Sequence, residues 1–166
     1  MDKSYIYLIF AIAAAAAFFI IVPKAQYKRH LLYGLIFGGI ADVISLVTLA
    51  PLQQIRFSNM GHFGLFGMFP VWVPVTWMFA FGVFFYLMPK RLSFLIPYLC
   101  AFTALSYVVG LVMESYGLFE YIGAQRYWAV PIFFVWYSVA AWVYHREIPA
   151  GIIQPAALKP RQDEEE

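Results

Sequence analysis

Five long apolar stretches, separated by short breaks that hold most of the charged residues, run through this chain of 166 residues. A helix rises about 1.5 Å per residue, so about 20 apolar residues reach across the hydrocarbon core of a bilayer. The stretches are residues 5–22, 31–52, 70–88, 92–116 and 127–144. They predict an all-α integral membrane bundle of five transmembrane helices, which forms one domain over residues 1–145. A signal peptide is the alternative for residues 5–22, but the residues before them are not basic, which favours a retained helix.

The composition agrees with a membrane protein. The chain is 63% hydrophobic and 12% charged, whereas a soluble domain is about half apolar and a quarter charged. A net charge of +2 gives no broad basic surface, so we expect no nucleic-acid partner. The expected partners are the lipid bilayer and either another membrane protein or a second copy of the chain.

Basic residues concentrate at one set of the predicted helix ends. One side holds Lys24, Lys28, Arg29, Lys90, Arg91, Arg146, Lys159 and Arg161, and the other holds Lys3, Arg56 and Arg126. Because basic loops stay in the cytoplasm, this distribution predicts a multi-pass protein of the cell membrane with its N-terminus outside and its C-terminus in the cytoplasm. Residues 146–166 contain three prolines and an acidic end, which predicts a disordered cytoplasmic tail.

Two predicted helices carry a stripe of small or polar residues. In the fourth span the stripe is Cys100, Thr103, Tyr107, Gly110 and Glu114, and in the fifth it is Tyr127, Pro131, Phe134, Ser138, Ala141 and His145. Steps of three and four residues place each set on one helix face. Since polar groups are costly in lipid, we expect both faces to turn toward other helices, and Cys100 to be buried.

A third stripe, in the second span, leads to an acid. Gly34, Gly38 and Asp42 follow at four-residue steps, and Ser45 comes three residues later. Small residues at this spacing let two helices approach closely in a membrane. The pattern predicts a helix contact that continues into the Asp42 carboxyl group.

Asp42 and Glu114 are the only acids inside the predicted spans, and an ionisable residue there is a functional hypothesis. Asp42 is predicted near the midplane and Glu114 near the outer interface, so we do not expect a carboxylate pair. The expected hydrogen-bond partners of Asp42 are Trp77, Thr103 and Tyr107. Two roles remain open for Asp42: a bond that joins helices, or a part in catalysis or transport.

The two outer connections supply a second group of candidate residues, Arg56 and His62 in residues 53–69 and Glu120 and Arg126 after the fourth span. We expect Glu114 to reach Arg126 or Arg56. Glycines disfavour a regular helix in residues 53–69, so this apolar connection is predicted to be interfacial or re-entrant. His62 is a possible proton shuttle, but one histidine without neighbouring ligands predicts no metal site. No phosphate-binding loop or nucleophile elbow occurs, so no cofactor or catalytic residue is assigned.

Three motifs resemble a known family. They are the aromatic, Pro-rich third span from Phe69-Pro70-Val71-Trp72-Val73-Pro74 to Met88-Pro89-Lys90, the run Glu114-Ser115-Tyr116-Gly117-Leu118-Phe119-Glu120-Tyr121, and the pair Tyr127-Trp128. Together they resemble small five-span integral membrane proteins of unknown function from endospore-forming bacteria. That resemblance implies a bacterial membrane protein with an acid, here Glu114, near the end of its fourth span, and it implies no activity. That family often has a tryptophan soon after the tyrosine, whereas here Gly123-Ala124-Gln125-Arg126 comes before Tyr127-Trp128, which is a departure from the family's pattern.

Three functions remain open after these observations. The first is a non-enzymatic membrane partner, sensor or scaffold whose polar stripes hold the bundle together. The second is a small-molecule or proton transport component that uses Asp42 and Glu114. The third is an intramembrane enzyme acting on a lipid or isoprenoid, which would need an acid inside an apolar pocket.

Overall fold

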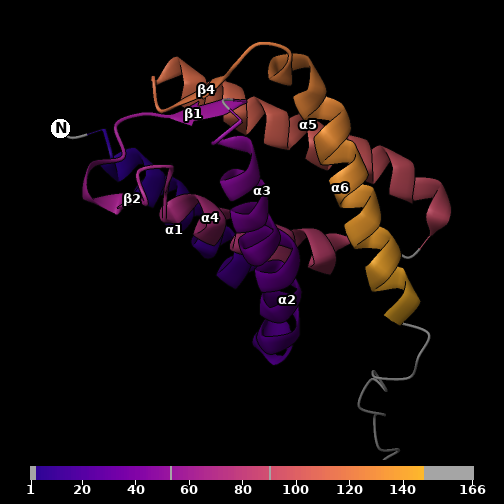
Figure 1. Cartoon of the computed structure of the whole chain (residues 1–166). Helices are drawn as coiled ribbons and strands as arrows, with labels where there is room; N and C mark the ends of the chain where they lie inside the picture. Colours follow the sequence, from indigo (N-terminus) through magenta and orange to yellow (C-terminus); the bar gives the residue numbers. More distant parts are fainter. Residues whose placement is uncertain (1–2, 53, 90, 148–166) are drawn as a thin grey trace, which may run out of the picture.

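The computed structural model describes residues 3–52, 54–89 and 91–147, and the protein is mostly helical (Figure 1). The predicted tail lies outside these residues from position 148 onward. The helices are α1 (Tyr5–Ile21), α4 (Trp72–Leu87), α5 (Leu92–Ser115), α6 (Gln125–Glu147) and one continuous helix over residues 24–49, made of η1 (Lys24–Gln26), α2 (Tyr27–Gly34), the π-helical segment η2 (Leu35–Ile40) and α3 (Ala41–Leu49).

Three helices of the described part are long and apolar enough to cross a membrane: Lys24–Leu49, Ser93–Ser115 and Gln125–Arg146. The other two, α1 and α4, contain 17 and 16 residues. The predicted third span is shorter than expected at its start. Pro70 does not open the helix, because it pairs with Gly64 in a short strand.

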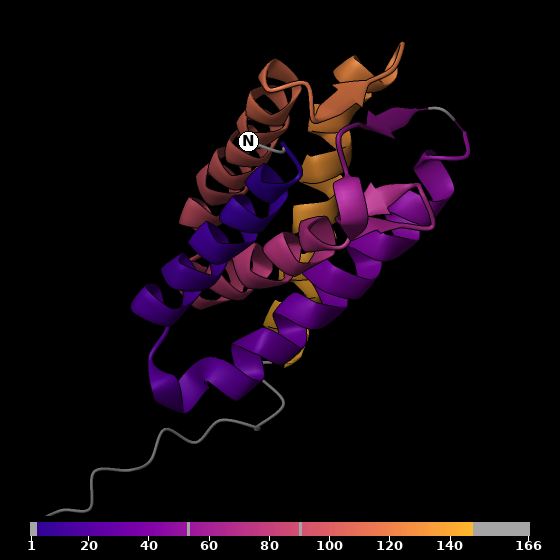
Figure 2. The same cartoon turned by 90° about the vertical axis from the view of Figure 1, so that its left-hand side faces the viewer.

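Short strands make the all-α prediction incomplete. The connections before α4 and after α5 contain β1 (Ile55–Phe57), β2 (Gly64–Leu65), β3 (Phe69–Pro70) and β4 (Phe119–Tyr121). β1 pairs antiparallel with β4, and β2 pairs antiparallel with β3. Backbone hydrogen bonds between β1 and β4 therefore join the two connections into one cap at one end of the bundle (Figure 2).

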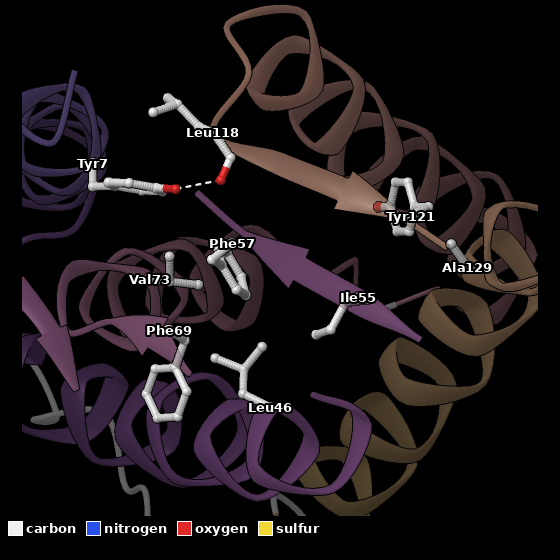
Figure 3. Packing of buried hydrophobic residues seen from close by; sticks show 9 residues of the cluster. All are labelled: Tyr7, Leu46, Ile55, Phe57, Phe69, Val73, Leu118, Tyr121 and Ala129. Carbon is white, nitrogen blue, oxygen red and sulfur yellow. Dashed lines mark hydrogen bonds between the residues drawn. The ribbon is translucent and has the colours of Figure 1, made fainter. Parts of the chain in front are cut away.

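Contacts between helix ends show that the helices alternate in direction. At one end the Arg29 guanidinium lies 5.1 Å from the Tyr144 ring, and the His30 ring lies 5.6 Å from the Tyr86 ring. These contacts bring together the start of α2 and the ends of α4 and α6. At the other end the Tyr7 hydroxyl donates to the backbone carbonyl of Leu118, so the start of α1 lies beside the end of α5 (Figure 3).

The predicted glycine contact of the second helix is confirmed. A Cβ atom on Gly34 would overlap the Met78 carbonyl oxygen, and one on Gly38 would overlap the Trp77 carbonyl oxygen. Only a residue without a side chain lets the two backbones approach so closely. α2 and η2 therefore lie directly on α4, whereas α3 packs against α4 much less.

The buried residues form two clusters. One gathers under the β1–β4 cap and contains Tyr7, Leu46, Ile55, Phe57, Phe69, Val73, Leu118, Tyr121 and Ala129 (Figure 3). The other is largely aromatic and joins α4, α5 and α6 through Phe81, Phe84, Phe85, Leu99, Tyr137, Ala140, Ala141 and Tyr144. Phe81 stacks on Tyr137 with ring centres 4.9 Å apart.

Two predicted helix faces are partly wrong. In α5, Thr103 is buried but Cys100 is exposed. In α6, Tyr127 is 80% exposed, and the buried positions include Ala129, Tyr137 and Ala140 as well as the predicted Ala141. Exposure of Cys100 and Tyr127 has a physical reason. A thiol behaves as a small apolar group, and a tyrosine at a helix end is typical of a membrane interface.

Candidate functional site

A cavity of about 530 Å³ lies between the helices beneath the β1–β4 cap. Its walls come from α1, α3, α4, α5 and α6 and from the strands β1 and β4 of the cap. Typical lining residues are Ala14 of α1, Leu46 of α3, Trp77 of α4, Val109 of α5 and Phe133 of α6. The lining is almost entirely apolar, and the volume falls within the range of about 300–1,000 Å³ that is usual for small-molecule sites.

Asp42 lies in the wall of this cavity, and Ser45 lines the same wall one helical turn further along. The Oδ2 atom of Asp42 is buried and has no hydrogen-bond partner among the residues that the structure describes. A buried polar atom without a partner costs about 1–3 kcal/mol, and such atoms are uncommon in folded proteins. The carboxyl group is therefore an unsatisfied polar site in a chamber whose surface is mostly apolar.

The predicted partners of Asp42 are distributed differently. Trp77 lines the same cavity. Thr103 Oγ1 is buried without a hydrogen-bond partner and is not part of the cavity lining. Tyr107 stacks on Tyr121, with ring centres 6.0 Å apart. The predicted bond between Asp42 and these residues is thus absent at Oδ2, and only Trp77 shares the site.

The π-helical segment η2 ends two residues before Asp42. An α-helix turns about 100° per residue, and a π turn adds one residue, so side chains after it are rotated relative to those before it. Gly34 and Gly38 face α4, while Asp42 lines the cavity. This local irregularity separates the acid from the glycine contact, and π turns are frequent at functional sites.

The cavity is open to the surface, because some of its lining residues are also exposed. Leu105 on α5 is 57% exposed and Leu87 at the end of α4 is 46% exposed, and both belong to its lining. Across from them, α1 contributes Ala13, Ala14 and Ala17. α1 packs chiefly on α4, and α5 packs chiefly on α6. The small alanine side chains of α1 therefore leave part of the space between the helices empty.

The predicted outer-face residues form two ion pairs. Arg126 donates to Glu114, as predicted. Arg56 lies 3.7 Å from Glu120, directly across the β1–β4 pair. Exposed pairs of this kind contribute at most about 1 kcal/mol. His62 is exposed on the turn Gly61–Phe63, and Glu114 is not part of the cavity lining, so these residues do not form one site with Asp42.

Tyr121 connects the cap with the cavity. It lies in β4, lines the cavity and is buried. Burial, together with the nearby Tyr107 and Glu114, raises the pKa of the Tyr121 phenol. The cap therefore presents an uncharged aromatic surface to the chamber.

Sequence reasoning missed the alanines of α1 and the aromatic residues of the cap as site residues. One signal was present: Ala13–Ala17 is a run of five small side chains in a helix that otherwise ends in bulky ones. The cap residues Phe57 and Phe119 gave no signal, because their place depends on pairing between distant segments.

No model of a known protein family, no curated protein and no solved structure matches this chain.

Proposed function

We propose that this protein crosses the bilayer five times and binds a lipophilic small molecule in its central cavity, as a non-enzymatic sensor or carrier. The observation that carries the proposal is the apolar cavity of about 530 Å³ with the unpartnered Oδ2 of Asp42 in its wall. A ligand pocket is typically concave, mostly apolar and equipped with a few convergent polar groups. This chamber has both features.

The alternating helix directions support five crossings. α1 and α4 are short for a bilayer, but α4 is largely enclosed by other helices and continues into the cap through β3. Lys24, Arg29, Arg91 and Arg146 belong to the end opposite the cap. By the positive-inside rule this end lies in the cytoplasm, and the cap and the N-terminus lie outside.

The same pocket would suit an enzyme that acts on a lipid, with Asp42 as general acid. An acid in such chemistry usually works with a base such as a histidine or a second carboxylate within hydrogen-bond reach of the reacting atoms. Within the described residues, Asp42 is the only carboxyl of the cavity lining, and no histidine lines it. Binding without turnover is the better supported function.

Proton transport has less support than binding. It would require a chain of polar groups from Asp42 to the outside. The lining around Asp42 is apolar, and Glu114 is paired with Arg126 outside the cavity. These positions favour a binding chamber over a relay.

The proposed topology predicts which positions a membrane-impermeant thiol reagent can reach. In a Cys100→Ser background, His62→Cys should react in intact cells, and Ala25→Cys should react only after the membrane is opened. Both native residues are exposed, at opposite ends of the bundle. The measurement is gel-shift labelling with a maleimide polymer. Labelling of both variants from outside would contradict five crossings.

The proposed binding function predicts a strong effect of filling the cavity. Ala14 lines the cavity and Ala16, on the same helix, is exposed and does not. We expect Ala14→Phe to lower the affinity for a lipophilic probe at least about tenfold. The phenyl ring would occupy part of the space that the probe needs, and each methylene of the probe that is no longer buried costs about 0.8 kcal/mol. Ala16→Phe is the matched control and should bind normally.

The readout is the fluorescence of the tryptophans, of which Trp77 and Trp136 line the cavity, during titration with farnesol in nanodiscs. Equal binding by wild type, Ala14→Phe and Ala16→Phe would overturn the proposal, because it would place the probe in the surrounding lipid.

A further inference from the structure

The polar groups of the cavity wall are unequal in what they can offer a ligand. Thr76 donates to the Trp72 carbonyl at 2.7 Å, Trp136 donates to the Phe37 carbonyl at 3.0 Å, and the Ser106 and Tyr137 hydroxyls bond each other at 2.8 Å. The hydrogens of Thr76 and Trp136 are therefore already used within the protein. Asp42 Oδ2 is the buried side-chain atom of the lining that has no partner in the described structure.

The wall excludes an anionic ligand. No lysine, arginine or histidine lines the cavity within the described residues. A phosphate or carboxylate head would be buried beside the Asp42 carboxyl with no opposite charge. Burying an unpaired charge in apolar surroundings costs far more than a hydrogen bond returns.

A cationic head fits poorly as well. An ammonium group would need Asp42 to be ionised, and the pair would then lie in an apolar chamber. A buried ion pair is favourable only where further hydrogen bonds satisfy its remaining donors and acceptors. Among the lining residues of α3, only Ser45 carries a further polar group for this purpose.

An uncharged polar head group avoids both costs, because it places no unpaired charge in the cavity and does not require Asp42 to be ionised. An uncharged carboxyl group has both a donor and an acceptor, so it can bond a hydroxyl or a carbonyl group. Ser45, three residues further along the same helix, is placed to make a second contact because residues three apart are neighbours on a helix.

The cavity volume limits the size of such a ligand. If each non-hydrogen atom takes about 30 Å³, as a water molecule does in the liquid, about 530 Å³ holds about 18 atoms. The mouth beside Leu87 and Leu105 lies on a helix surface that would face acyl chains. A ligand of this size and polarity dissolves in the bilayer and would reach the chamber from there.

We infer that the ligand is an uncharged, membrane-dissolved lipophile that carries one hydroxyl or carbonyl group, and that this group is held by Asp42 with Ser45 beside it. The inference rests on the proposed binding function. It adds the chemical class of the ligand and the residue that selects it.

Four probes with the same isoprenoid tail and different head groups test this ligand class: farnesol, farnesylamine, farnesyl phosphate and the hydrocarbon farnesene. Each is titrated into phosphatidylcholine nanodiscs that hold the full-length protein, with empty nanodiscs as the reference for simple partitioning. We expect farnesol to bind about tenfold more tightly than the other three, the value of about one hydrogen bond.

Two variants then assign the preference to Asp42. Asp42→Leu should lower the farnesol affinity to that of farnesene and leave farnesene unchanged. Asp42→Asn keeps a donor and an acceptor and should retain most of the preference. This difference between variants distinguishes recognition of the head from a general loss of folding, which would reduce the binding of farnesene too.

The outcomes separate the inference from the function on which it rests. Equal affinity for farnesol and farnesene, or tighter binding of the amine or the phosphate, would overturn the ligand class while the binding function stands. Failure of all four probes to exceed empty nanodiscs would overturn the binding function itself.

Discussion

Gly38→Ala is expected to destabilise the protein by about 3 kcal/mol or more, near the upper end of the usual cost of overpacking. The added Cβ would overlap the carbonyl oxygen of Trp77 and lie 2.5 Å from its carbonyl carbon and 2.9 Å from Met78 N. These are backbone atoms of α4, so no side chain can rotate to make room. The two helices would have to separate along the contact that holds α2 and η2 on α4.

Gly39 provides the matched control for this prediction. The nearest atoms to a Cβ there would be Leu35 Cδ1 at 3.4 Å, Met78 Cβ at 3.7 Å and the Pro74 carbonyl oxygen at 3.9 Å, all at ordinary contact distance. Alanine favours helix over glycine by up to about 1 kcal/mol, so Gly39→Ala should be neutral or stabilising. The measurement is the apparent melting temperature in detergent micelles. Similar melting of both variants would show that the two backbones do not approach closely at Gly38.

Asp42→Leu is expected to stabilise the ligand-free protein while it removes the preference for a polar head. The substitution replaces a buried, unpartnered carboxyl oxygen with a methyl group on a side chain of the same branched shape, and the cavity beside it has room for the larger group. An unsatisfied buried polar group costs about 1–3 kcal/mol, and its removal should raise the melting temperature. A stabilising change at a site that binding requires is the usual sign of a functional residue.

Thr103→Val is the control for this effect. Thr103 Oγ1 is also buried without a partner, but it lies outside the cavity lining. Valine at this position should raise the melting temperature and leave farnesol binding unchanged. A lower melting temperature for Asp42→Leu would instead support the hypothesis that the carboxyl joins helices by a bond.

The helices were predictable because each needs only its own local pattern. Apolar runs of suitable length and prolines near their ends placed the helix ends to within three residues, except that the second helix begins at Lys24 rather than at residue 31. The spacing of Gly34 and Gly38 identified a close contact. The Glu114–Arg126 pair was predictable because both residues lie near the same helix ends.

The strands and the cavity depend on distant segments and were not predictable in this way. Arg56 and Glu120 meet across β1 and β4, although 63 residues separate them in the chain (120 − 56 − 1 = 63). The cavity exists because α3 diverges from α4 after the π-helical segment, and no hydrophobic period reveals a π turn. Asp42 was recognised as a candidate from its charge alone, but its unpartnered state follows from that divergence.

Pairing between β1 and β4 also has a consequence for biosynthesis. β4, the second strand of the cap, is synthesised only after α1, the helix over residues 24–49, α4 and α5. The last wall of the chamber, α6, follows it. The chamber can therefore close only when translation of the helical region is nearly complete. Until then Asp42 is not covered by the complete set of cavity walls. We therefore expect a membrane chaperone or insertase to remain bound to the nascent chain until α6 has been made.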